Sequence, residues 1–235
     1  MNIRINELVD SRDTVNKWME RFGVRFGVYK HGIFNEQLFP FDSIPRIISS
    51  DDWGYLEKGL RQRVTALNKF LWDVYHDKRI IKDAIVPEEF VYSSKGYMPE
   101  CEGISPTGEV YAHIAGIDLV EGKDGQWYVL EDNLRIPSGA SYPMIAREIT
   151  RKVSPQTFTQ NAVAENRDYA RLLATMMEEM NDGRGISVIL TPGRYNSAYF
   201  EHSYFAEKTG ATLAYPGDLF VEDNKVYYAG IYKEK

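Results

Sequence analysis

The chain has very little cysteine, and what it has cannot form an intrachain disulfide. Cys101 is the single cysteine among 235 residues, which excludes the disulfide framework typical of small secreted domains. Long apolar runs are missing as well, since no segment approaches the roughly 18 consecutive apolar residues that a membrane-spanning helix needs. Residues 1–13 carry mixed charge and lack the apolar stretch of a secretory signal. We therefore expect a cytoplasmic protein.

Blocks of like charge are also absent. The net charge is -6 and the isoelectric point is about 5.4. Proteins that bind a phosphate backbone gather lysine and arginine into clusters, so a nucleic-acid partner is not expected. In contrast, 43% of the residues are hydrophobic and 13% are aromatic, enough to fill the core of one large domain or two small ones.

The periodicity of apolar residues predicts a mixed chain of α/β class with α+β character. The clearest segment is a helix from about Asp51 to His76, in which apolar residues trace one face and Asp51 can cap the start. The other predicted elements are helices near 1–22, from Pro87, 143–153 and 160–181, a strand at 24–29, an irregular passage at 34–48, and hairpins at 111–133 and 221–228.

The segment from residue 186 to residue 215 has a different pattern. A short apolar run ends at Leu190, a helical stretch reaches Lys208, and a second short strand ends at Tyr215. This strand, loop, helix and strand order is typical of a parallel sheet.

The most informative stretch is the predicted hairpin in the middle of the chain. If Asp124 and Gly125 form a two-residue type I′ turn, Asp118 faces Glu131 on the opposite strand. Side chains alternate between the two faces of a strand, so Glu131 and Asn133 project from one side while the residue between them projects from the other. The pattern therefore predicts a cluster of two carboxylates and one amide.

Two carboxylates directly opposite each other repel, and something must offset that repulsion. Magnesium would do so, because it takes oxygen ligands, commonly one or two carboxylates, and completes its octahedron with water and substrate phosphates. The amide oxygen of Asn133 would add a neutral ligand or orient a phosphate. The alternative is a solvated hairpin whose charges face water. Spacing alone leaves both interpretations open, because a longer turn would shift the register by one residue.

Several separate blocks resemble, in the same order, the circularly permuted type 2 ATP-grasp family, which is related to glutathionylspermidine synthetase. They are FPFDSIPRII at 39–48, LRQRVTALNKFLWDVYHD at 60–77, HIAGIDLV at 113–120, VLEDNLRIPSG at 129–139 and LTPGRYNSAYFEH at 190–202. In ATP-grasp enzymes an aspartate on one strand and a Glu-x-Asn on the next hold magnesium against ATP. The resemblance assigns these roles to Asp118, Glu131 and Asn133.

The resemblance implies an ATP-dependent carboxylate–amine ligase. In such a reaction a carboxylate attacks the γ-phosphate to give an acylphosphate, and an amine then displaces phosphate to form an amide. The implied cofactors are ATP and Mg²⁺ or Mn²⁺. The implied partners are small-molecule or peptide carboxylates and amines, with no nucleic acid and no membrane.

The family's order of segments also predicts a division of the chain. Residues 1–158 would form the permuted metal-binding portion, 159–183 a connecting helix, and 184–235 the start of a Rossmann-like substrate domain. The nucleotide-clamping half would follow Lys235, so we expect the 235-residue chain alone to turn over no ATP. The rival interpretation is a non-catalytic truncated remnant or binding module that acts with a second chain carrying the nucleotide half.

Five further residues are candidates for the site. Arg135 could contact a phosphate or a substrate carboxylate through its planar guanidinium, or it could form a surface salt bridge. Ser138 and Gly139 belong to a loop of small residues whose amides could bind an anion, although most such loops are simply turns. Asn196 and Ser197 lie where the carboxyl end of a strand meets a helix start, the usual position of ligand crevices in open α/β sheets.

Overall fold

The computed structural model describes residues 9, 11–181 and 183–229. The chain separates into two compact units, one made of residues 47–137 and the other of the segments before and after them. The two units follow from how compactly the chain packs. The predicted division of the chain at residues 158 and 183 follows from expected function instead, and it stays a prediction. Among the described residues, no helix combines the length and the apolar character that crossing a membrane requires.

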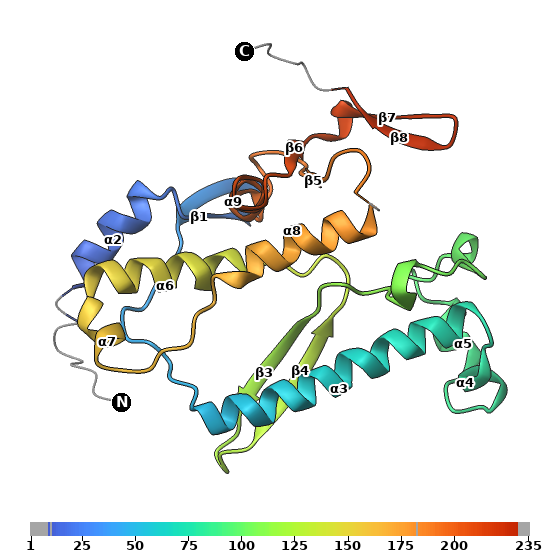
Figure 1. Cartoon of the computed structure of the whole chain (residues 1–235), viewed down its shortest axis with the longest axis horizontal. Helices are drawn as coiled ribbons and strands as arrows, with labels where there is room; N and C mark the ends of the chain where they lie inside the picture. Colours follow the sequence, from blue (N-terminus) through green and yellow to red (C-terminus); the bar gives the residue numbers. More distant parts are fainter. Residues whose placement is uncertain (1–8, 10, 182, 230–235) are drawn as a thin grey trace. The chain divides into compact units, whose positions relative to one another are not determined.

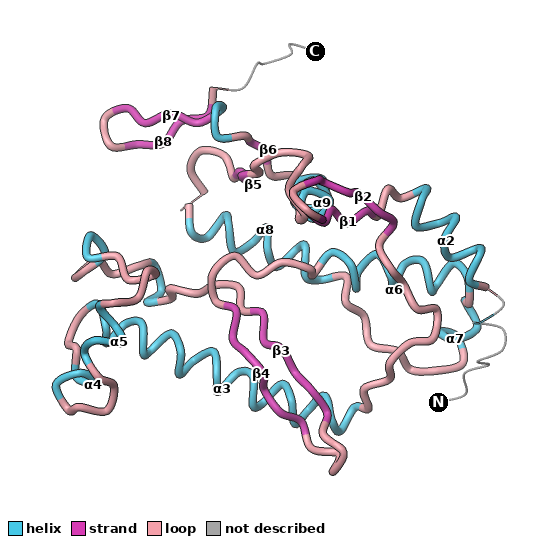
Figure 2. The backbone as a smooth tube through the Cα atoms, turned by 180° about the vertical axis from the view of Figure 1, so that it is seen from behind, coloured by secondary structure: helices cyan, strands magenta, loops and turns pink. Residues whose placement is uncertain are grey.

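The unit of residues 47–137 is built on one long helix with a hairpin running along it (Figures 1 and 2). Its elements are α3 (Ser50–Tyr75), α4 (Arg79–Lys82), α5 (Glu88–Tyr92), 3-10 turns at Pro99–Cys101 and Thr107–Glu109, β3 (Gly116–Glu121) and β4 (Trp127–Asn133). The long helix is confirmed, but its cap is Ser49 rather than Asp51, because the Ser49 hydroxyl accepts the Asp52 N–H at 3.1 Å.

A single asparagine ties the segment before β3 to α3. The Asn68 Oδ1 accepts the backbone N–H groups of Tyr111 and Ala112, both at 2.9 Å. Its Nδ2 donates to the carbonyls of Val64 at 3.1 Å and Ala112 at 3.3 Å. Four backbone groups are thus satisfied by one side chain, which fixes where the hairpin starts along the helix.

The second unit places most of its helices around a separate core. Its elements are α2 (Arg12–Arg21), β1 (Arg25–Lys30), β2 (Ile33–Leu38), α6 (Ser141–Val153), α7 (Pro155–Thr159), α8 (Asp168–Met180), β5 (Val188–Leu190), α9 (Tyr199–Thr209), β6 (Thr212–Ala214), a 3-10 turn at Pro216–Asp218, β7 (Leu219–Glu222) and β8 (Lys225–Tyr228). The core joins α2 to α6 through five buried residues, Val15, Met19, Val24, Ile145 and Ile149.

Two predicted boundaries in this unit need correction, and a third falls partly outside the described residues. The helix predicted at 1–22 is present as α2 from Arg12 to Arg21, while residues 1–8 and 10 lie outside the described residues. Residues 34–38, expected to be irregular, complete the antiparallel hairpin β1–β2, in which the Phe34 ring covers Gly27 and fills the space that a side chain there would need. Helix α8 begins at Asp168 rather than near residue 160.

The predicted strand, helix and strand pattern is present, with β5 and β6 paired in parallel and α9 between them. Each sheet formed by the described residues contains two strands, so the larger Rossmann-like sheet is not seen. The last hairpin, β7–β8, turns at Asp223 and Asn224, both with positive φ, as that sequence predicts.

Candidate functional site

The central hairpin brings Asp118 opposite Glu131, although its turn differs from the predicted one. Gly122 pairs with Gln126, so the loop has three residues rather than two. The longer loop shifts the pairing register by one residue relative to the prediction. A bulge at Leu130 shifts the register back, since Leu119 pairs with residue 129 whereas Asp118 pairs with residue 131. The predicted carboxylate pair is therefore formed through two offsetting changes of register.

The carboxyl groups of Asp118 and Glu131 interact across the hairpin. A side-chain hydrogen bond with Glu131 raises the pKa of Asp118, and partial desolvation and the negative charge of Glu131 act in the same direction. Asn133 lies on the same face, because its Nδ2 donates to the Glu131 Oε1 at 3.1 Å. None of the ion pairs among the described residues involves Asp118 or Glu131. A bound cation would offset the repulsion between the two carboxylates.

The opposite face of β4 is anchored to α3. Asp132 accepts two hydrogen bonds from Arg63, from Nε to Oδ1 and from Nη2 to Oδ2, both at 2.6 Å. The hydrogen bond from Arg63 lowers the pKa of Asp132, so this carboxylate remains ionised next to its arginine. The paired geometry fixes the rotation of the strand and keeps Glu131 and Asn133 on the face away from Arg63.

The chain leaving β4 folds back over the start of β3. A side chain at Gly116 would place its Cβ 2.9 Å from the Pro137 Cβ and 3.6 Å from the Asn133 Cβ, so only glycine fits at this position. Arg135 lies in this returning segment with an exposed side chain, and no hydrogen bond or ion pair joins it to another described residue. Its predicted role at a phosphate or carboxylate stays a prediction.

The small-residue loop before α6 does hold an anion, and that anion is the chain's own Glu201. The Gly139 N–H donates to Glu201 Oε1 at 2.8 Å. The N–H and the hydroxyl of Ser141 both donate to Oε2 at 2.8 Å. The Gly139 amide, predicted to bind a cofactor, is therefore already engaged, while Ser138 is exposed. Sequence reasoning missed Glu201, whose signal is an acidic residue set among aromatic ones on a helix.

Asn196 and Ser197 lie at the start of α9, as predicted, and line a cavity of about 170 Å³. The Asn196 Oδ1 accepts the Ala198 N–H at 2.9 Å, so this side chain also orders the turn into the helix. Arg25 and Glu36 of the β1–β2 hairpin line the same cavity. The volume suits a small group or a few waters rather than a whole nucleotide.

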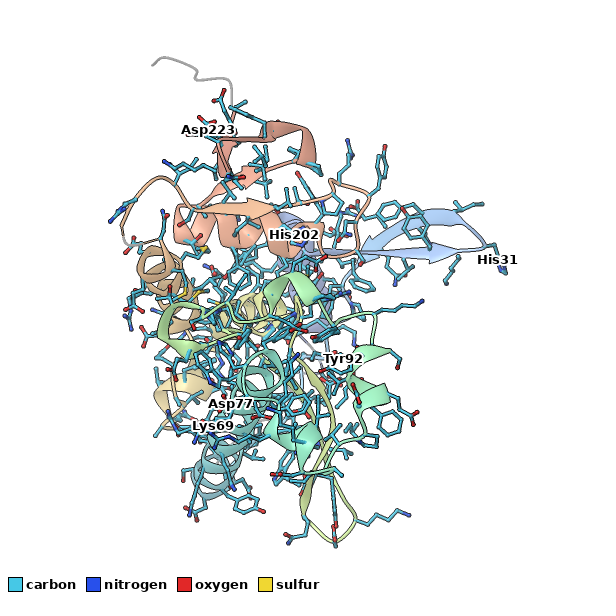
Figure 3. The ribbon with its side chains drawn as sticks, turned by 90° about the vertical axis from the view of Figure 1, so that its right-hand side faces the viewer. His31, Lys69, Asp77, Tyr92, His202 and Asp223 are labelled. Carbon is cyan, nitrogen blue, oxygen red and sulfur yellow. The ribbon has the colours of Figure 1, made fainter. Side chains whose placement is uncertain are left out.

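A buried threonine at the end of β5 contacts a histidine of α9. The Thr191 Oγ1 is 2.9 Å from the His202 Nδ1 and accepts the Gly193 N–H at 3.2 Å. Thr191 is fully buried, so its O–H needs an acceptor, and we assign the His202 Nδ1 to that role. In the neutral ring the proton then lies on Nε2. Burial lowers the pKa of His202, opposed by the charge on Glu201. Figure 3 marks His202 on α9.

The comparisons with known proteins identify the family. A family model described as circularly permuted ATP-grasp type 2 matches residues 45–235. This chain belongs to that family. The match covers both strands of the central hairpin and confirms the resemblance carried by the sequence blocks.

Relatives of this ATP-grasp chain are longer proteins. An uncharacterized protein of Synechocystis sp. is 44% identical over 204 residues, which are 86% of this chain and 42% of that protein. An uncharacterized protein of Mycobacterium tuberculosis is 43% identical over 195 residues, or 82% of this chain and 35% of the relative. The "Putative glutamate–cysteine ligase 2-2" of Frankia casuarinae is 41% identical over 194 residues, or 81% of this chain and 22% of the relative. The chain thus spans less than half the length of these curated relatives.

Proposed function

We propose that this chain carries the metal-binding portion of an ATP-dependent ligase that joins a carboxylate to an amine through an acylphosphate. The observation that carries the proposal is the hairpin pair Asp118 and Glu131, with Asn133 beside it, in a chain of the ATP-grasp family. The ligase name of the Frankia relative supports the reaction class, although the match covers only 22% of that protein.

The donor set fits magnesium or manganese. The described residues hold no cluster of three or more His, Cys, Asp or Glu side chains suited to a metal. Two carboxylates and one amide oxygen are instead the partial set that magnesium uses when substrate phosphates and water supply the remaining ligands. A divalent cation held there would neutralise charge on the transferred phosphoryl group. Binding should be weak without nucleotide for the same reason.

The chain's own residues position this set and govern its protonation. Two features orient Glu131. The Arg63–Asp132 pair holds β4 from its opposite face, and the bulge at Leu130 sets the backbone directly before Glu131. Because Glu131 raises the pKa of Asp118, protonation of Asp118 competes with cation binding. Metal affinity should accordingly increase as the pH rises through the pKa of Asp118.

Four of the remaining candidates have proposed contacts with substrates. The exposed guanidinium of Arg135 would bind a phosphate or a substrate carboxylate. Ser138 would offer its hydroxyl at the loop before α6, while Asn196 and Ser197 would contact a substrate group in the small cavity beside α9.

Manganese titration followed by electron paramagnetic resonance tests the proposal directly, because free Mn²⁺ gives a signal that is lost on binding. We expect the 235-residue chain to bind one Mn²⁺, weakly, in the absence of nucleotide. The double variant Asp118→Asn, Glu131→Gln should lose this binding. Glu222→Gln provides a matched control, because Glu222 is a strand carboxylate that lies opposite Lys225 rather than a second acid. Equal Mn²⁺ binding by the double variant and the wild type would refute the site.

A further inference from the structure

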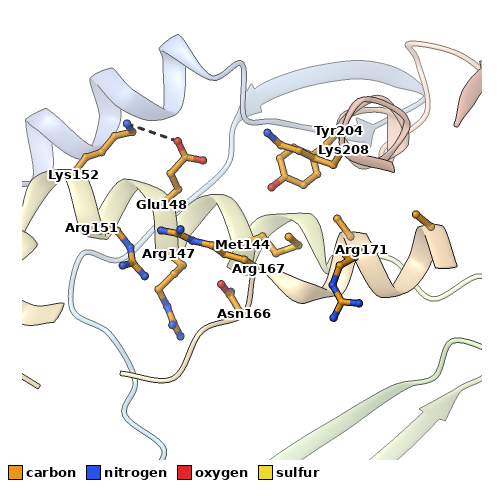
Figure 4. A pocket seen from close by; sticks show the side chains of 12 residues that line it. Met144, Arg147, Glu148, Arg151, Lys152, Asn166, Arg167, Arg171, Tyr204 and Lys208 are labelled. Carbon is orange, nitrogen blue, oxygen red and sulfur yellow. Dashed lines mark ion pairs between the residues drawn. The ribbon is translucent and has the colours of Figure 1, made fainter. Parts of the chain in front are cut away.

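A second cavity lies among α6, α8 and α9, within one compact unit (Figure 4). Its volume is about 720 Å³, in the range of small-molecule sites. Its lining includes one acidic residue, Glu148, and six cationic ones, Arg147, Arg151, Lys152, Arg167, Arg171 and Lys208. We call it the basic groove. None of these residues belongs to the proposed metal site.

Nearby acids neutralise the basic groove only in part. Glu165 accepts a hydrogen bond from Arg151 at 2.8 Å and pairs with Arg167 at 3.3 Å. The hydrogen bond from Arg151 is the main cause that lowers the pKa of Glu165, with the charges of Arg151, Arg167 and Arg147 adding to it. Glu165 therefore lies in the field of three guanidinium groups. Three other cations of the groove also have acidic partners, Lys152 with Glu148 at 3.8 Å, Arg171 with Asp168 at 3.3 Å and Lys208 with Glu207 at 3.9 Å. Six cations thus meet four acids, and positive charge is left over in a chain whose net charge is -6.

Arg147 is fixed in place without an acidic partner. Its Nη1 donates to the Ala164 carbonyl at 2.5 Å. Its guanidinium also lies 5.9 Å from the centre of the Phe158 ring, which Arg151 approaches to 4.5 Å. No ion pair within 4 Å involves Arg147 in the described part of the chain. The remaining N–H groups of Arg147 are thus oriented at little further entropic cost to a ligand.

We propose that the basic groove binds a small polyanion that carries two or more phosphate or carboxylate groups. The arginines match such groups through paired N–H donors. Met144, Ala170 and Ala174 line the same cavity and would contact the carbon skeleton of the ligand. The volume favours a small molecule over an acidic segment of another protein, which would need a longer surface.

Calorimetry with inorganic triphosphate, in buffer containing a chelator, tests the proposal without involving the metal site. A parallel titration with citrate distinguishes a phosphate ligand from a carboxylate one. Arg167→Gln with Arg171→Gln is the first variant, because both side chains are largely exposed, 71% and 66%, and their loss should leave the fold intact. Arg147→Gln is the second. Arg61→Gln on α3, 77% exposed, is the matched control.

We expect saturable binding of triphosphate or citrate by the wild type, weakened about tenfold for each arginine removed from the groove. Arg61→Gln should bind as the wild type does. Wild-type affinity in both groove variants would overturn the proposal, as would an equal loss in Arg61→Gln, which would indicate attraction to net charge alone. Failure of the wild type to bind either probe would also overturn the proposal, and saturable binding of an acidic peptide in that case would assign the groove to a protein partner.

Discussion

The Glu201 carboxylate holds the loop before α6 by three hydrogen bonds, and Glu201→Gln breaks that arrangement with little change of shape. The amide oxygen of glutamine can keep the two donors of Ser141, but its NH₂ group must then face the Gly139 N–H, so two donors oppose each other. An unsatisfied buried donor costs about 1–3 kcal/mol, and changing two charge-assisted bonds to neutral ones costs about 0.5–1 kcal/mol each. We therefore expect a loss of about 2–5 kcal/mol in the free energy of unfolding.

Urea unfolding followed by circular dichroism measures this loss, provided that the slope of the transition is unchanged. Glu207→Gln is the control, because Glu207 lies on the same helix with its side chain 80% exposed, and it should change stability by no more than about 0.5 kcal/mol. A second readout is Tyr142. Burial, aided by the charge on Glu201, raises the pKa of Tyr142 to about 12. Removing that charge should lower the Tyr142 pKa, as followed by NMR of ring-labelled tyrosine.

Two results would refute the reasoning. If Glu201→Gln lies within about 0.5 kcal/mol of the wild type, the three hydrogen bonds are not formed by an ionised carboxylate. If the stability falls but the pKa of Tyr142 does not move, the loss comes from packing rather than from the removed charge.

Two further predictions concern the other unit. Because Glu131 raises the pKa of Asp118 above 3.8, this interaction stabilises the fold below that pH and the benefit is lost as the pH rises through the folded-state pKa. Glu131→Gln should therefore flatten the fall in melting temperature above pH 4 in chelator-containing buffer, and a steeper fall would contradict the pairing. Asn68→Ala should cost about 2–4 kcal/mol through lost backbone partners. It should also speed amide hydrogen exchange at Tyr111 and Ala112, and unchanged exchange would count against the tie to α3.

Local chemistry explains which parts of the fold were predictable. The apolar stripe of α3 and the Asp223-Asn224 turn are read from neighbouring residues, and both agree with the structure. Pro40 favours an irregular segment, but the strand at 33–38 ends two residues before it and is therefore compatible with the proline. The composition of residues 160–167 predicts a helix, but the segment is not helical. Its Glu165 and Asn166 instead contact Arg151 and Pro143 of α6.

The candidate site was predictable where contacts are short in sequence. Asp124 decides the turn of the central hairpin, because its carboxylate accepts the Gln126 N–H at 3.1 Å and the Tyr128 hydroxyl at 2.7 Å. Turn preferences alone favoured two residues and missed this side-chain contribution. The pairing of Asp118 with Glu131 was nevertheless correct. The role of Glu201 could not be read from the sequence, since its partners lie 60 and 62 residues earlier.

The separation between Glu201 and its partners has a consequence for the order of folding during synthesis. No local side chain caps the start of α6, and the carboxylate from α9 takes that place. A ribosome makes α6 first, so its amino end stays without this partner until about sixty more residues have emerged. Helix α6 should thus be completed late, when α9 docks, and a nascent chain stalled before residue 201 should leave the Ser141 amide open to exchange with solvent.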